Sequence, residues 1–207
     1  MDTLLLVDRD EASVTAAARE LAGSGAAAEP FVADVTDRES LAGLTGQVRE
    51  AGTLRAVARD AGISPTMADW RRVLAVDLVG TALLCDALRP LAVPGTATVC
   101  FASMAPLLAT TELAGARTRA IPRGVRRRRA HLTMGRLVQL TPLRRAGLRG
   151  EFAAVVAFLL SDEAAFVNGT DILIDGAVIA AARDQRPGRS RAGRPRPRSA
   201  GHRVCCR

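Results

Sequence analysis

The chain has 207 residues, of which 48% are hydrophobic and 24% charged, so it is long enough for one domain with a substantial core. It contains no run of about 18 or more apolar residues and no basic N-terminal start, which argues against membrane insertion and against export. We therefore expect a cytoplasmic protein without a membrane partner. The formal net charge of +8 comes from arginine, because the sequence contains no lysine.

The positive charge is concentrated in two segments. Residues 117–129 and 186–207 hold about half of the arginines and no acidic residue, so the rest of the chain is acidic overall. No aromatic side chain lies among the arginines of 117–129, which weakens a stacking mode of nucleic-acid binding. We expect an atypical basic segment over about 116–137 and a disordered Arg/Pro-rich tail over 183–207, with a nucleic-acid partner disfavoured.

The four cysteines are Cys85, Cys100, Cys205 and Cys206, and their spacing fits neither a metal site nor a disulfide framework. Cys85 and Cys100 fall inside predicted elements, where we expect buried apolar thiols. The sequence therefore predicts no metal site.

The first elements alternate in type. An apolar run over 3–7 predicts a strand that ends at Asp8, and residues 10–22 place apolar side chains on one helical face. A second strand is predicted over 31–33, ending at Asp34. This order is typical of a βαβ unit with parallel strands.

The same alternation continues. Thr36 or Asp37 can cap a helix that runs to about Ala51. Residues 54–58 form another short apolar run, which stops at the loop 59–62. Strands that alternate with helices predict a parallel α/β sheet, and ligands bind beyond the carboxyl ends of such strands.

A long helix follows, because apolar residues recur at helical spacing from Thr66 or Asp69 to Arg89, where Pro90 stops it. Pro94-Gly95 then predicts a turn before a strand over 98–102.

Near the end of the domain, a helix is predicted over 151–160 and a last strand over 172–176. The apolar face of the helix is expected to be buried, with Phe152, Val155, Val156 and Leu159.

Motifs that follow these strands resemble the classical short-chain dehydrogenase/reductase family. The family's Asn-Asn-Ala-Gly loop is here Arg59-Asp60-Ala61-Gly62, its helix asparagine is Asp77 in the run 76–80, and its strand-end serine is Ser103. Leu-Thr-Pro-Leu-Arg-Arg-Ala-Gly over 140–147 and Ile-Leu-Ile-Asp-Gly over 172–176 are similar to later family segments. The resemblance covers roughly 3–112 and 138–182.

The resemblance implies an α/β fold with a Rossmann-like, doubly wound parallel sheet in three layers, forming one domain over 1–182. It implies an oxidoreductase that acts on a small secondary alcohol or carbonyl compound with NAD, and it allows a homo-oligomer. An acid at the end of the second family strand accepts hydrogen bonds from the adenosine ribose and repels a 2′-phosphate, so NAD is favoured over NADP. The implied catalytic residues are Ser103 and Asp77, and the implied cofactor-binding residues are Asp8, Arg9, Asp34, Val35, Ala61 and Gly62.

The sequence departs from the family in two places. The first strand and the Thr-Gly-x-x-x-Gly-x-Gly turn that approaches the pyrophosphate have no counterpart, so we expect a chain truncated at its N-terminus that binds dinucleotide weakly. The halves of its sheet must then pair directly or leave a gap. The Tyr-x-x-x-Lys helix has no counterpart either, because the sequence contains no tyrosine and no lysine. Without that general acid/base we expect little or no hydride transfer, as in a pseudoenzyme.

Other interpretations stay open. A non-catalytic remnant, or a damaged gene product read out of frame over about 116–137 and 183–207, would explain two family blocks separated by an arginine-dense insert. A nucleic-acid-binding protein is supported by the basic segments alone, and a steep salt dependence of binding would favour it. A hydrolase triad at Ser103 is disfavoured, because the two histidines, His131 and His202, lie in the basic segments.

Overall fold

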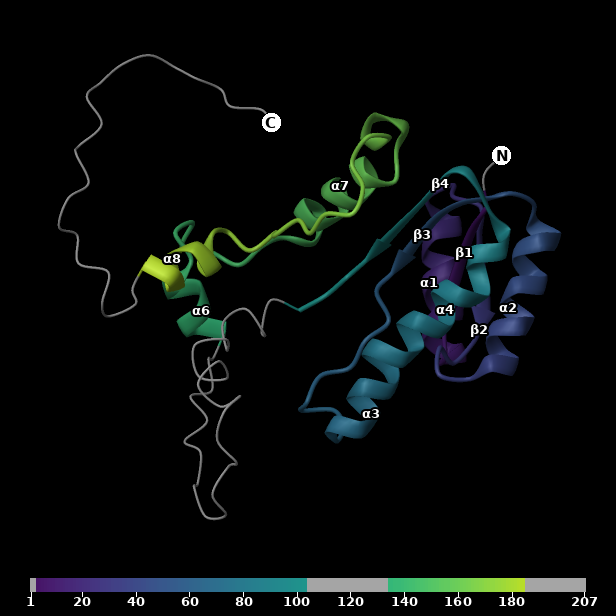
Figure 1. The fold of residues 1–207 in the computed structure, drawn as a ribbon, viewed down its shortest axis with the longest axis horizontal. Helices are drawn as coiled ribbons and strands as arrows, with labels where there is room; N and C mark the ends of the chain where they lie inside the picture. Colours follow the sequence, from purple (N-terminus) through teal and green to yellow (C-terminus); the bar gives the residue numbers. More distant parts are fainter. Residues whose placement is uncertain (1–2, 104–133, 185–207) are drawn as a thin grey trace. The chain divides into compact units, whose positions relative to one another are not determined.

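The computed structural model describes residues 3–103 and 134–184 of the chain (Figure 1). The chain divides into two compact units, one built from 1–103 and 149–171 and the other from 104–148 and 172–207. The predicted tail lies outside the described residues from 185 onward, and so does the predicted basic segment up to 133.

The first strand and helix are confirmed, each shifted by one residue from the predicted bounds. β1 is Leu4–Asp8 and α1 is Glu11–Gly23. The Asp10 side chain caps α1 by accepting a hydrogen bond from the backbone N–H of Ser13 at 2.7 Å. β2, Ala28–Val32, starts earlier than predicted and pairs with β1 in parallel.

The second crossover is also confirmed. α2 spans Arg38–Ala51, and of the two predicted caps Asp37 is the one used, since its carboxylate accepts from the backbone N–H groups of Glu39 and Ser40. β3 follows as Leu54–Arg59.

The predicted long helix is one helical run of four parts (Figure 1). It begins at the cap Asp69 with α3 (Trp70–Leu74), passes through a π-helical turn η1 (Ala75–Val79), and continues as α4 (Gly80–Leu88). The α-helix ends at Leu88, one residue before the predicted end, and Pro90 is the second residue of the short 3₁₀ turn η2 (Arg89–Leu91), where a missing N–H costs little.

β4, Ala92–Cys100, starts and ends earlier than the predicted 98–102 and pairs with β3 in parallel. The predicted Pro94-Gly95 turn becomes an irregularity inside the strand, where the register shifts and Gly95 has a φ of +91°. The Thr96 hydroxyl closes it by accepting from the N–H of Val93 at 2.9 Å and donating to the carbonyl of Leu54 at 2.8 Å.

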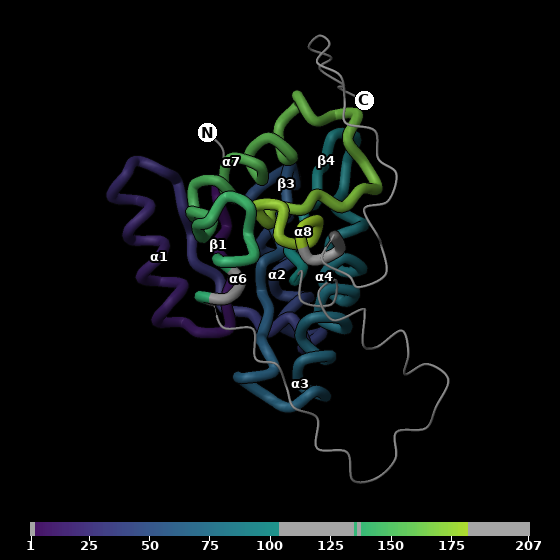
Figure 2. The backbone as a smooth tube through the Cα atoms, turned by 90° about the vertical axis from the view of Figure 1, so that its left-hand side faces the viewer, coloured from purple at the N-terminus to yellow at the C-terminus, as the bar shows by residue number. Residues whose placement is uncertain are grey.

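The strands form two separate parallel pairs, β1 with β2 and β3 with β4, and no strand pairing joins the pairs within the described residues. The sequence allowed the two halves of the sheet either to pair directly or to leave a gap, and the structure has the gap. Helices bridge it instead, because the core cluster of Leu41 and Leu44 from α2 and Leu84 and Leu88 from α4 takes in Leu5 of β1, Phe31 of β2 and Val57 of β3. We call this leucine-packed junction the seam. α1 lies on one side of the strands and α4 on the other, so the unit has three layers (Figure 2).

The later helix is confirmed as α7, Arg149–Leu159, but its predicted apolar face is not fully buried, and 37% of Phe152 is exposed. The predicted last strand over 172–176 is wrong. Asp175 instead turns the chain into α8 (Val178–Asp184), because its carboxylate accepts from the N–H groups of Ala177 at 2.9 Å and Ile179 at 3.0 Å. The capped amides lie just after 172–176, and no strand of the described residues pairs with that run.

α6, Met134–Leu140, was not predicted, and its first turn takes up the end of the expected basic segment. α6 and α8 lie in the same unit, where Thr141 packs against Gly176 and Val178 is 1% exposed. Among the helices of the described ranges, none has the length and apolar character needed to cross a membrane.

Candidate functional site

The candidate site lies in the loops that follow the four parallel strands. β1 leads to Asp8 and Arg9, and the carbonyl of Asp8 accepts a hydrogen bond from the N–H of Ala33 at 3.0 Å, so the loop with Asp34 begins beside it. β3 and β4 are joined in the same way, because the N–H of Phe101 donates to the carbonyl of Arg59 at 2.9 Å. The loops after paired strands are therefore neighbours, as the sequence predicts.

Asp8 and Arg9 are exposed at the start of α1. The Oδ1 atom of Asp8 accepts from the N–H of Asp10 at 2.9 Å, which holds the carboxylate over the loop. Arg9 borders an open depression of about 640 Å³ whose other walls come from the first turns of α1. Asp8 does not line this depression itself, but its exposed carboxylate can accept hydrogen bonds from a hydroxyl-bearing ligand.

Asp34 is held by three donors. Its Oδ1 accepts from the N–H of Thr36 at 2.8 Å and from the Thr36 hydroxyl at 2.6 Å, and its Oδ2 lies 3.1 Å from Nη2 of Arg72 on α3. The Thr36 hydrogen bonds, with a smaller contribution from Arg72, hold the pKa of Asp34 below its ordinary value. The stabilisation from this carboxylate is present above its unfolded pKa of about 3.9 and is lost as the pH falls through the lower folded value.

Val35 packs directly on α4. A Cβ added to Gly80 would lie 2.8 Å from Cγ2 of Val35 and 3.3 Å from its carbonyl oxygen, so only glycine permits this approach. The loop after β2 is therefore seated on α4.

Gly80→Ala is expected to destabilise the chain by about 1–3 kcal/mol, because the added methyl must displace the Val35 backbone. Gly46→Ala is the matched control: Gly46 lies in α2, and its added Cβ would meet nothing within 4 Å. That variant should be neutral or up to about 1 kcal/mol more stable, since alanine favours helix. Urea unfolding measures both. Equal stabilities for the two variants would contradict the tight packing at Val35.

Ala61 and Gly62 follow β3 and are exposed, and the adjoining Ile63 is anchored to the π-helical turn. Oδ1 of Asp77 accepts from the N–H of Ile63 at 2.9 Å, and its carbonyl oxygen accepts from the Thr81 hydroxyl at 2.6 Å. The geometry gives Asp77 a loop-holding contact, and its catalytic role stays a prediction.

The sequence reasoning missed Arg59. Its side chain is 5% exposed, Nη2 donates to the carbonyl of Val76 in η1 at 2.8 Å, and Nε has no partner within the described residues. The guanidinium thus ties the end of β3 to the π-helical turn. The one signal in the sequence was an arginine where the family has asparagine.

Ser103 is exposed and follows β4 as the last described residue of the range 3–103. Through Arg72, Asp77 and Gly80, the helical run from α3 to α4 contacts the loop after β2 and the loop after β3. These two loops lie on opposite sides of the seam. No set of three or more His, Cys, Asp or Glu residues suited to a metal ion occurs within residues 3–103 and 134–184.

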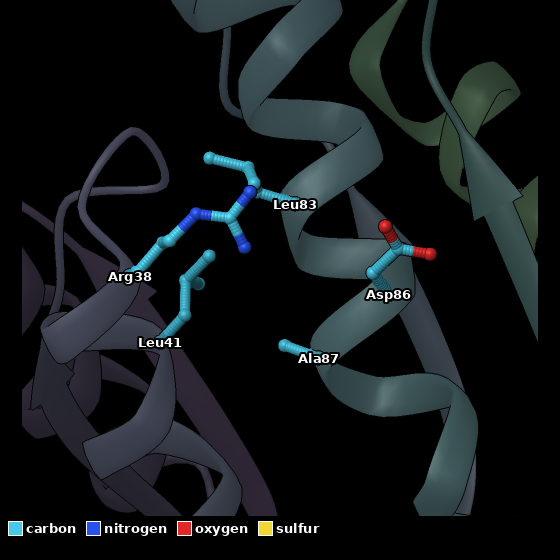
Figure 3. Close-up of a pocket in the computed structure, with 5 residues that line it drawn as sticks. All are labelled: Arg38, Leu41, Leu83, Asp86 and Ala87. Carbon is cyan, nitrogen blue, oxygen red and sulfur yellow. The ribbon is translucent and has the colours of Figure 1, made fainter.

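One cavity in this unit lies apart from the loops. Figure 3 shows it between α2 and α4, with Arg38 and Leu41 on one side and Leu83, Asp86 and Ala87 on the other. Its volume is about 180 Å³, and none of the predicted site residues lines it.

Comparisons with known proteins identify the family. The family model described as "Enoyl-(Acyl carrier protein) reductase" matches residues 2–117 and 116–178. D-threitol dehydrogenase of Mycolicibacterium smegmatis is 30% identical in an alignment of 209 positions, gaps included, that covers 82% of this chain and 80% of that protein. The short-chain dehydrogenase/reductase bsc3 of Alternaria brassicicola is 54% identical over 44 residues, which cover 21% of this chain and 16% of bsc3.

A solved structure shows the same fold. A short-chain type dehydrogenase/reductase from Mycobacterium ulcerans superposes with a TM-score of 0.67 at 23% identity, covering 86% of this chain and 81% of that one. The parallel strand pairs and the loops at their ends agree with these matches. The chain therefore belongs to the short-chain dehydrogenase/reductase family of oxidoreductases.

Proposed function

We propose that this chain binds NAD at the carboxyl ends of its strands and presents an alcohol or carbonyl compound to Ser103, but transfers hydride poorly. One observation carries the proposal: the helical run α3–η1–α4 holds the loops after β2 and β3 together, through Arg72, Asp77 and Gly80. These are the loops in which a doubly wound sheet binds a dinucleotide.

The described residues fit the adenosine half of NAD. Asp8 is an exposed carboxylate that can accept hydrogen bonds from the ribose hydroxyls and repel a 2′-phosphate. Val35 is only partly buried beside Asp34, so it can offer an apolar surface to a base. The Arg9 side chain, next to Asp8 in the chain, can contact the adenosine half of NAD from the other side.

The fit to the pyrophosphate is poor. The resemblance assigns β1 to the family's second strand, and the sequence has no glycine-rich turn that opens a helix after a strand. Weak dinucleotide affinity follows from the lack of this turn.

At the substrate end, the Ser103 hydroxyl can hydrogen-bond the substrate oxygen. NAD, when bound, would supply the hydride acceptor. Because the sequence contains no tyrosine and no lysine, no side chain of the family's usual kind can take the proton from that oxygen. The D-threitol dehydrogenase among the relatives makes linear polyols the first substrates to test.

Cofactor binding tests the proposal directly. Calorimetry is expected to show weak binding with NAD preferred over NADP, and Asp8→Ala should weaken NAD binding by about tenfold, since it removes hydrogen bonds to a charged group. Glu20→Ala, which removes the same charge from an exposed position on α1, is the control and should change nothing.

Tighter binding of NADP than of NAD would remove the assignment of Asp8. An equal loss of affinity in both variants would mean that Asp8 makes no specific contact with the ribose.

A further inference from the structure

The β3–β4 pair places Cys100 on the face of the sheet that α4 covers. In the parallel register Cys100 lies opposite Arg59, and Thr98 lies opposite Val57. Partners in register share a face of the sheet, and so do residues two apart along one strand. Val57 packs against the cluster that contains Leu84 and Leu88 of α4, so the side chain of Cys100 points toward this helix.

Cys85 lies on that helix, next to the buried Leu84. The Cys100 thiol lies close enough to Cys85 to affect its pKa. Burial is the largest cause that raises the pKa of Cys85, and the charge and the hydrogen bond of the Cys100 thiol follow. Asp86 also raises it, and the Arg59 guanidinium lowers it. Both cysteines are free and exposed, so the expectation of buried apolar thiols is wrong for this pair.

We propose that Cys85 and Cys100 form an oxidisable dithiol, which closes into a disulfide between α4 and β4 when the chain meets a peroxide. Strand register, helix packing and solvent access carry this inference. Nothing in the proposed oxidoreductase chemistry uses either thiol.

The reaction is balanced with hydrogen peroxide as the oxidant. One thiolate attacks the O–O bond, which breaks, so that a sulfenic acid forms and hydroxide leaves. The second thiol attacks the sulfenic sulfur, the S–O bond breaks, and the S–S bond forms with loss of water. Overall, two thiols lose two protons and two electrons, and the peroxide is reduced to two waters.

The disulfide would connect two parts of the candidate site. Cys100 ends β4 shortly before Ser103, and Cys85 lies on the helix that seats Val35 through Gly80. A covalent link here would fix the strand that leads to Ser103 against the helical run that holds the dinucleotide loops.

Peptide mapping of the full chain tests this. Digestion before aspartate separates Cys85, in the peptide 77–85, from Cys100, in the peptide that begins at Asp86. After treatment with hydrogen peroxide and alkylation of remaining thiols, we expect these two peptides to be joined, and dithiothreitol to separate them. The tail variant with Cys205→Ser and Cys206→Ser should give the same cross-link.

Two results would overturn the proposal. One is that Cys85 and Cys100 stay alkylatable after peroxide while the chain remains folded by circular dichroism. The other is that the cross-link forms as fast in urea as in buffer, because a pair held together by the fold must react faster when folded. Cys100→Ser serves as the chemical control and should leave the thiol of Cys85 unlinked.

Discussion

Oxidation of a secondary alcohol with NAD is expected to proceed about 10² to 10⁴ times more slowly in this chain than in a tyrosine-bearing member of the family, because a lost general acid/base typically costs that factor. Ser103 remains to bind the substrate oxygen, but the proton must pass to water. NADH formation with linear polyols, at NAD concentrations set by the measured affinity, gives the rate.

Ser103→Ala separates the alternatives. If Ser103 holds the substrate, this variant should remove whatever turnover is left. A turnover close to that of a tyrosine-bearing family member, abolished in Ser103→Ala, would show that another group moves the proton and would refute the expected deficit. Because cofactor affinity is measured separately, a failure to bind NAD is distinguishable from a failure of the chemical step.

Leu41→Ala is expected to have the largest effect on stability, a loss of about 2–5 kcal/mol, because it removes a leucine side chain from the middle of the seam and leaves a cavity. Leu41 is 2% exposed and belongs to the cluster that holds both strand pairs. That cost approaches the whole free energy of unfolding of many small domains. The midpoint and slope of urea unfolding measure the change.

Leu78→Ala is the matched control, because Leu78 is 64% exposed on the π-helical turn. It should change the free energy of unfolding by no more than about 0.5 kcal/mol. A similar small loss for Leu41→Ala would mean that the seam contributes little to the fold.

The strands and their loops were predictable because they depend on local sequence. Short apolar runs followed by Asp8, Asp34 and Gly62 mark the strands and their ends. The expected burial of these strands is not found, because most of their residues are exposed or half-buried. The helix caps at Asp37 and Asp69 need only a side chain and the next few amides, so sequence reasoning included each of them as one of two candidates.

Features that depend on partners distant in sequence were not predictable. The burial of Arg59 follows from the carbonyl of Val76, which the π-helical turn presents, and no local pattern announces such a turn. The run 172–176 has a strand's composition, but a strand requires a pairing partner, and none of the described strands pairs with this run. The exposure of Cys100 likewise depends on what covers β4.

The seam between the strand pairs has a mechanical consequence. Within each pair, backbone hydrogen bonds fix the spacing between the two strands at about 4.8 Å. Across the seam, no strand pairing joins the two pairs in the described residues. The separation of Asp8 from Gly62 is therefore set by the volume of the leucine side chains packed between them. Conservative changes of side-chain size in this core are therefore expected to change the width of the proposed dinucleotide site without altering any residue assigned to it.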